Sequence, residues 1–326
     1  MLPLIFLCGI GFILLYYGAE WLVKGSSSLA RSLGVTPIVI GLTVVAFGTS
    51  APELVVSVVS SIKAKSMIAV GNVVGSNICN IALVLGASAL FQPISSQRAV
   101  VRRDIPLMLA VSLYLLLLSL NSQLGRLEGL TLFVGVVVYT FMNYYWCRKE
   151  RPAQCNPGSD AIAGEVEDIG YIDSRGRQLV LVGVGIAGVV GGAEIVVDSA
   201  VKIMTILGVG EKFIGLTIVA FGTSLPELAT SVVAAIRKEM DISIGNLVGS
   251  NVFNILSVIG VAALVRPIPI PGGFFGSGLW LDYLVMMGTS AMPWLMMRKS
   301  LTISRANGAT LLACYVTYLG YLIIKA

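Results

Sequence analysis

Two glutamates stand in a motif that the chain contains twice. Glu53 lies in the segment GLTVVAFGTSAPEL and Glu227 in GLTIVAFGTSLPEL. Both segments are long and apolar, so each carboxylate is expected near the middle of a membrane, where an ionised carboxylate costs on the order of 2.5 to 3.5 kcal/mol. A hard cation held by carboxylate, hydroxyl and carbonyl oxygens offsets such a cost. The pair therefore predicts a cation site inside the membrane.

Further oxygen-bearing residues accompany each glutamate. In the apolar segment that follows each motif, three of them recur every four positions, which places them on one stripe of a helix. These are Asn72, Ser76 and Asn80 in the first copy and Asn246, Ser250 and Asn254 in the second. We expect the two copies to meet in one cluster. Its predicted members are Glu53, Glu227, Ser50, Ser224, Thr49, Thr223, Ser76, Ser250, Asn80 and Asn254. An all-oxygen cluster suits sodium, calcium or magnesium and not soft metals.

A proline precedes each glutamate, Pro52 in the first copy and Pro226 in the second. Proline lacks a backbone donor and clashes with the preceding turn, so each helix is expected to break in mid-membrane. The break should free carbonyls around Ala46 and Phe47, with the same geometry at Ala220. At this depth such carbonyls need protein, water or ions as partners.

The serine of each motif also has a purely structural explanation. Ser50 with Glu53, and Ser224 with Glu227, fit the S-x-x-E capping box, in which both side chains satisfy the first amides of a helix. Because the pattern occurs twice at matching depth beside polar stripes, we favour cation binding, with which capping can coexist.

Other repeated residues favour helix contacts over cation binding. Each second motif has a G-x-x-x-G spacing, which is typical of close helix packing in membranes. The glycines are Gly71 and Gly75 in the first copy and Gly245 and Gly249 in the second. Asn77 and Asn251 lie about 100 degrees off the polar stripe and are expected to hydrogen-bond to a neighbouring helix. Glu20 and Glu194, near helix ends, are expected at the interface or in helix contacts.

The composition of the chain predicts which kind of secondary structure positions these residues. Hydrophobic residues make up 56% of the 326, charged residues 12%, and the mean hydropathy is +0.90, which a water-soluble globule does not sustain. We predict an all-α membrane protein of about ten transmembrane helices. The expected spans are 2–23, 37–62, 66–91, 104–120, 127–147, 179–199, 213–236, 242–265, 278–297 and 308–324.

An internal repeat organises these helices. Residues 18–94 align with 192–268 at a constant offset of 174. Each copy begins in the first helix of a five-helix unit, so the second copy enters the membrane from the other side and the repeats are inverted. The predicted units are a first repeat at 1–147, a cytoplasmic linker at 148–178 and a second repeat at 179–326.

Charge placement predicts the orientation in the membrane. Most of the 22 Lys and Arg residues fall in the loops of one side if the N-terminus is outside, and such loops stay in the cytoplasm. Both termini are then expected outside a plasma or inner membrane. The first apolar stretch lacks a basic leader and a cleavage site, so we expect it to be retained. The net charge of +5 thus indicates topology, not a nucleic-acid partner.

Metal and redox chemistry of other kinds is not expected. The five cysteines are odd in number and scattered, and no histidine is present to complete a zinc site. No Walker run, GxSxG or HExxH motif occurs, so neither an ATP-driven pump nor an enzyme is expected.

The motifs resemble those of the cation/calcium exchanger superfamily, whose two alpha-repeats carry GTSxPE in one helix and GNxxGSN in the next. The likeness covers the ten-helix plan and is most specific at 36–94 and 210–268. The chain looks most like the prokaryotic sodium/calcium exchanger branch, because the proton/calcium branch typically shows a GNxxE motif. The resemblance implies that Glu53 and Glu227 chelate calcium. The other implied ligands are Thr49, Ser50, Ser76, Thr223, Ser224, Ser250 and the carbonyls of Ala46 and Ala220, with Asn80 on the central stripe.

One position departs from the family pattern. Many exchangers have aspartate where this chain has Asn254. With asparagine the site has two formal negative charges, which one calcium or two sodium ions balance. This charge count disfavours a third sodium ion and a dependence on potassium.

The function implied by the resemblance is secondary antiport of sodium for calcium. The ions are cargo, no resident cofactor is expected, and the partners are small inorganic cations and the lipid bilayer, without an obligate protein partner. Proton/calcium or other cation/proton antiport is the alternative, since buried glutamates can take up protons. A cation channel, which also uses carboxylates that face water, is less favoured.

Overall fold

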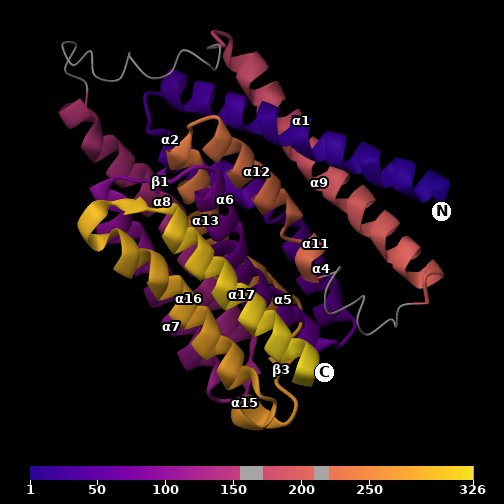
Figure 1. Ribbon diagram of the computed structural model, residues 1–326. Helices are drawn as coiled ribbons and strands as arrows, with labels where there is room; N and C mark the ends of the chain where they lie inside the picture. Colours follow the sequence, from indigo (N-terminus) through magenta and orange to yellow (C-terminus); the bar gives the residue numbers. More distant parts are fainter. Residues whose placement is uncertain (155–171, 209–219, 326) are drawn as a thin grey trace.

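The computed structural model describes residues 1–154, 172–208 and 220–325. Most of this chain is helical (Figure 1). Segments marked η are π-helical turns. The first half contains α1 (Leu2–Leu33), α2 (Pro37–Ile40), η1 (Gly41–Val45), α3 (Ala46–Thr49), α4 (Ala51–Ile62), α5 (Ser66–Ile78), η2 (Cys79–Leu85), α6 (Gly86–Phe91), η3 (Val100–Asp104), α7 (Ile105–Ser119) and α8 (Arg126–Gln154). The second half contains α9 (Arg175–Ile206), α11 (Ala220–Gly222), α12 (Leu225–Ile236), α13 (Met240–Phe253), η5 (Asn254–Ile259), α14 (Gly260–Val265), α15 (Gly273–Gly276), α16 (Leu279–Ser300) and α17 (Arg305–Lys325).

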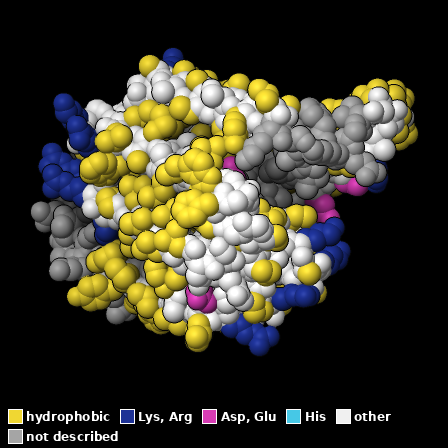
Figure 2. Space-filling view, turned by 90° about the horizontal axis from the view of Figure 1, so that it is seen from below, with side chains coloured by type: hydrophobic (Ala, Val, Ile, Leu, Met, Phe, Trp, Pro, Cys, Tyr) yellow, Lys and Arg dark blue, Asp and Glu magenta, His cyan; other side chains and the backbone are white. Residues whose placement is uncertain are grey.

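The described helices are those of a membrane protein. Six are long and apolar enough to cross a bilayer, and the bent pair formed by 37–49 and 51–62 makes a seventh candidate. Helices also cover the other expected spans where the structure describes them, whereas positions 213–219 of the seventh span lie outside the described residues. Figure 2 shows hydrophobic side chains over much of one face, with Lys and Arg gathered toward its edge.

The predicted linker at 148–178 is helical at both ends. Helix α8 continues to Gln154 and α9 begins at Arg175. Helices therefore extend into both ends of the predicted linker. Its central part, 155–171, lies outside the described residues.

Two continuous helical runs form the centre of the bundle. In an apolar stretch of 18 residues within each run, 72% of the stretch is buried in 66–91 and 78% in 240–265. The corresponding shares are 22% for α1 and 33% for α9. Each run contains a π-helical segment, η2 or η5, at equivalent positions of the repeat. The polar stripes predicted on these two runs consequently lie in the interior of the protein.

Helices α1 and α9 form a long slanting pair on one side of this bundle (Figure 1). Glycine makes their approach possible, since a Cβ added to Gly18 would lie 2.6 Å from the backbone N of Val189. A Cβ on Gly185 would likewise lie 2.6 Å from the backbone N of Leu22. Any larger residue at these positions would push the two helices apart.

Two short antiparallel ribbons join the halves of the chain. Strand β1 (Ile94–Ser95) pairs with β4 (Thr302–Ile303), and β2 (Gln123–Leu124) pairs with β3 (Ile268–Pro269). Strands β1 and β3 are equivalent at the repeat offset of 174, yet they lie toward opposite ends of the bundle (Figure 1). Equivalent parts of the two copies therefore lie at opposite ends.

Candidate cation site

Both predicted breaks are present next to the glutamates. Helices α2 to α3 and α4 form a pair bent by 45° around Ser50, as Pro52 predicts. In the second copy α11 ends at Gly222 and α12 begins at Leu225. Each glutamate thus lies in the first turn of a restarting helix, where the amide dipole favours negative charge.

Glu53 and Glu227 are both fully buried, with 0% of their surface exposed. Ser50, in the first break, donates a hydrogen bond to Glu227 Oε1 at 3.1 Å, across 177 positions of the chain. Ser250 donates to the same oxygen at 3.5 Å. The structure therefore brings both breaks and both glutamates together.

Several buried oxygens of this cluster have no hydrogen-bond partner. An acceptor left in this state costs about 1 to 3 kcal/mol, and more when it is charged. The atoms are both carboxylate oxygens of Glu53, Oε2 of Glu227, the hydroxyl oxygens of Ser76 and Ser224, and Oδ1 of Asn80 and Asn254. Carboxylate, hydroxyl and amide oxygens gathered without partners are the donor set that a hard cation takes.

The two asparagines of the stripes are held by their off-stripe neighbours. Asn77 Nδ2 donates to the carbonyl of Asn251, and Asn251 Nδ2 donates to the carbonyl of Asn77, both at 3.2 Å. Asn80 Nδ2 donates to Asn251 Oδ1 and Asn254 Nδ2 donates to Asn77 Oδ1, both at 3.1 Å. The predicted helix contact of Asn77 and Asn251 is confirmed. Because Nδ2 is engaged, each stripe asparagine keeps its Oδ1 oxygen as an acceptor.

The outer asparagine of each stripe supports the glutamate helix instead. Asn72 Nδ2 donates to the carbonyl of Glu53 at 3.2 Å and to Ser57 Oγ at 2.9 Å. Asn246 Nδ2 donates to Ser231 Oγ at 3.1 Å, which is the equivalent contact. These supporting serines were missed in the sequence, although their offset of 174 identifies them as a repeated pair.

The capping explanation does not account for the serines. Neither Ser50 nor Ser224 makes a side-chain cap bond to its helix. The hydroxyl of Ser50 reaches the other repeat, and that of Ser224 has no hydrogen-bond partner. Neither serine hydroxyl therefore caps the helix that begins next to it.

The backbone carbonyls that lose their amide donors at the breaks are not all those expected. The carbonyl of Ala46 accepts from the amide of Ser50 at 3.0 Å, so the break does not free it. Helical bonds run from residue i to i−4, so Pro52 leaves the carbonyl of Gly48 without its amide donor. In the second break the amide of Ser224 donates to Phe221 at 3.1 Å, and Ala220 is not its acceptor.

The two threonines sit at these breaks. The hydroxyl of Thr49 is buried and lies 3.1 Å from both the Val45 carbonyl and Asn246 Oδ1. Thr223 lies in the turn between α11 and α12 and lines a cavity next to Ser76. Both threonines are thus adjacent to the glutamate helices.

The predicted glycine packing is confirmed in the second copy. A Cβ on Gly249 would lie 2.7 Å from the carbonyl oxygen of Leu42, and one on Gly245 would lie 2.8 Å from that of Ile38. At the repeat offset of 174, the positions equivalent to Ile38 and Leu42 are 212 and 216, which lie outside the described residues. The packing of Gly71 and Gly75 therefore stays a prediction.

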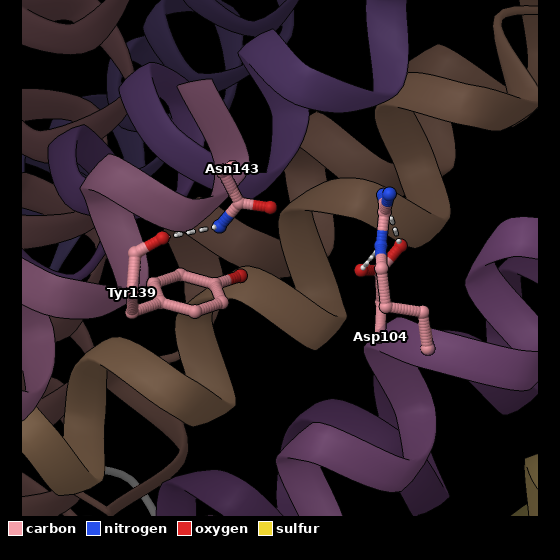
Figure 3. Close-up of polar contacts among 4 residues, drawn as sticks. Asp104, Tyr139 and Asn143 are labelled. Carbon is pink, nitrogen blue, oxygen red and sulfur yellow. Dashed lines mark hydrogen bonds and ion pairs between the residues drawn. The ribbon is translucent and has the colours of Figure 1, made fainter. Parts of the chain in front are cut away.

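Asp104 is a further buried carboxylate and, unlike the two glutamates, it forms an ion pair. Asp104 is 1% exposed and accepts from Arg103 Nε at 2.8 Å (Figure 3). The guanidinium of Arg103 also stacks over Trp146 at 4.5 Å. Among the described ion pairs, none involves Glu53 or Glu227. Among the described residues, no group of three or more His, Cys, Asp or Glu side chains could hold a metal ion.

Known proteins are similar to this chain over nearly its whole length. The family model described as "Sodium/calcium exchanger protein" matches residues 3–145 and 177–324. The chain belongs to the sodium/calcium exchanger family. It is 36% identical over 312 residues to the putative antiporter CaxA of Alkalimonas amylolytica, with 95% of each chain covered. It is 30% identical to the sodium/calcium exchanger MaX1 of Methanosarcina acetivorans, again with 95% of each covered.

The exchanger fold is shared with a solved structure. The sodium-calcium exchanger NCX_Mj, soaked with Na⁺ and Ca²⁺, matches with a TM-score of 0.82 and 33% identity, covering 98% of both chains. The chain is thus a prokaryotic member of the cation/calcium exchanger superfamily, a family of membrane antiporters and not of enzymes.

Proposed function

We propose that this exchanger trades sodium for calcium at one site between its two broken helices. The observation that carries the proposal is the pair of buried glutamates, of whose four carboxylate oxygens all but Glu227 Oε1 lack a hydrogen-bond partner, as do oxygens of neighbouring serines and asparagines. A bound cation would offset the desolvation free energy of burying both charges. Sodium and calcium would compete because they would use the same oxygens.

The proposed ligands come from both copies of the motif. They are Glu53, Glu227, Ser50, Ser224, Thr49, Thr223, Ser76, Ser250, Asn80, Asn254 and the carbonyls of Ala46 and Ala220. The two glutamates supply two negative charges, which one calcium or two sodium ions neutralise. Asn80 and Asn254 supply neutral oxygens, so a third sodium and a potassium ion are not part of the proposal.

The proposed topology has ten crossings in two inverted five-helix repeats, 1–147 and 179–326, joined by a cytoplasmic linker within 148–178. The position of β1 and β3 toward opposite ends of the bundle supports inversion. Both termini would lie outside the plasma or inner membrane. A single chain would suffice, with no obligate protein partner and no cofactor.

Transport would follow from alternating access. The long pair α1 and α9 would slide against the central bundle and expose the site to one side at a time. Sodium moving down its gradient would enter the site, and calcium would leave in exchange.

The direct test uses vesicles that contain the purified protein. An outward sodium gradient should drive calcium uptake, and Glu53→Gln or Glu227→Gln should abolish it because one charge is lost. Asp198→Asn is a control, since Asp198 is exposed and paired with Lys202. Calcium uptake that survives both glutamine variants would refute the site.

The alternative driving ion is the proton. Replacing the sodium gradient with a pH gradient separates the two antiport mechanisms, because only a proton antiporter then accumulates calcium. A channel would instead pass many ions per opening in a planar bilayer.

A further inference from the structure

Asn77 and Asn251 tie the two central helical runs to each other. Each donates from Nδ2 to the backbone carbonyl of the other, at 3.2 Å. Both residues are buried, with 0% and 1% of their surface exposed. Because a backbone carbonyl only accepts hydrogen bonds, this contact fixes which end of each side-chain amide is nitrogen and which is oxygen. The Oδ1 atom of each residue is therefore left for another partner.

These two oxygens orient the asparagines of the polar stripes. Asn77 Oδ1 accepts from Asn254 Nδ2, and Asn251 Oδ1 accepts from Asn80 Nδ2, both at 3.1 Å. Each contact crosses from one repeat to the other. The Oδ1 atoms of Asn80 and Asn254 are the ends of these amides that remain, and both are buried without a hydrogen-bond partner. Asn77 and Asn251 thus decide that an oxygen, and not an NH2 group, stays available.

The orientation of an amide decides whether the side chain attracts or repels a cation. Its oxygen is an acceptor and a ligand that hard cations take, whereas its NH2 group has two donor hydrogens and no acceptor. An asparagine whose amide is not held can turn either group toward an ion. A turned amide would remove one ligand and place hydrogens with partial positive charge against the cation.

We propose that Asn77 and Asn251 are positioning residues for cation binding, which hold Asn254 and Asn80, respectively, with their oxygens available to the ion. The inference rests on the function proposed above and adds to it two residues that are not among the proposed ligands. A competing explanation is that Asn77 and Asn251 only hold the two runs together through their backbone contacts. That role would not distinguish one stripe asparagine from the other, whereas positioning couples Asn77 to Asn254 and Asn251 to Asn80.

Double-mutant cycles of calcium binding to the purified protein separate the two roles. Asn77→Ala and Asn254→Ala should each raise the dissociation constant for calcium several-fold. The double variant should match Asn254→Ala to within about twofold, because Asn77 acts through Asn254. Asn77→Ala with Asn80→Ala is the matched control, since these residues lie on one run and neither side chain bonds to the other in the described part of the chain. The two effects in the control pair should multiply.

The repeat supplies an independent second cycle. Asn251→Ala and Asn80→Ala should be coupled in the same way, and this cycle decides the result if Asn77→Ala does not fold. Effects that multiply in the crossed pairs, or coupling that is equal in the crossed pairs and the control pair, would overturn the positioning role. Absence of calcium binding to the wild-type protein would instead contradict the proposed function.

Discussion

The two halves of the molecule share residues but not surroundings. Glu20 on α1 forms an ion pair with Arg237 at the end of α12. The equivalent positions at the offset of 174 are Glu194 and Lys63, which carry the same charges. Both are exposed, and no ion pair joins them in the part of the chain that the structure describes.

Packing follows the same division. Helix α1 packs on α12, and Glu239 at the start of α13 accepts from Ser27 of α1 at 2.5 Å. The equivalent pair, α9 and α4, makes no comparable contact within the described ranges. The two ends of the described chain therefore differ in how α1 and α9 contact the neighbouring helices.

The largest effect is expected from locking the end at which Glu20 pairs with Arg237. Glu20→Cys with Arg237→Cys, bridged by a short bifunctional thiol reagent, should abolish exchange, and reduction should restore it. A spanning reagent is needed because two long side chains keep the backbones too far apart for a direct disulfide. Uptake of calcium into vesicles before and after reduction is the measurement.

The matched pair tests whether the ends alternate. Glu194→Cys with Lys63→Cys should cross-link slowly in the state described here and faster when sodium and calcium gradients cycle the protein. Equal cross-linking of both pairs under all ion conditions would show that the two ends do not exchange roles.

A smaller effect is expected from changing one member of the asparagine pair. If two carboxylates hold the cargo as proposed, exchange of one calcium for two sodium ions moves no net charge, and an imposed membrane potential should not change the rate of the wild-type protein. Asn254→Asp adds a negative charge and should make exchange voltage-dependent, by about 2.3 kcal/mol per elementary charge per 100 mV. Calcium uptake under a potassium diffusion potential is the measurement, with Asn80→Asp as the equivalent change. Voltage-dependent uptake by the wild-type protein would contradict the charge count.

The smallest effects concern the glycines. Gly249→Ala places a Cβ 2.7 Å from the carbonyl oxygen of Leu42, which should lower the free energy of unfolding by about 1 to 3 kcal/mol. A Cβ on Gly75 meets nothing within 4 Å among the described residues, so Gly75→Ala should change it by less than about 1 kcal/mol. Thermal unfolding in detergent compares the two variants. Equal losses of stability would mean that both glycine faces are packed.

Much of the fold and site was predictable because the repeat supplies long-range information. The offset of 174 pairs Glu53 with Glu227, and helical spacing places Asn80 on the polar stripe while Asn77 points to a neighbour. Proline chemistry marks the breaks, because Pro52 cannot donate a helical hydrogen bond. These properties depend on local geometry and composition, which a sequence displays directly.

Other features depend on information that a sequence does not display. The π-helical segments η2 and η5 shift the register by one residue inside otherwise regular helices, and no residue type marks them. The acceptor role of Ala46 depends on where the break falls to within one residue.

Equilibrium binding of radioactive calcium to the purified protein tests the central claim most directly. Glu53 and Glu227 together should bind one calcium ion per chain, two sodium ions should displace it, and glutamine at either position should remove the binding. Calcium binding that is insensitive to sodium, or that persists in both glutamine variants, would contradict a shared site between the two broken helices.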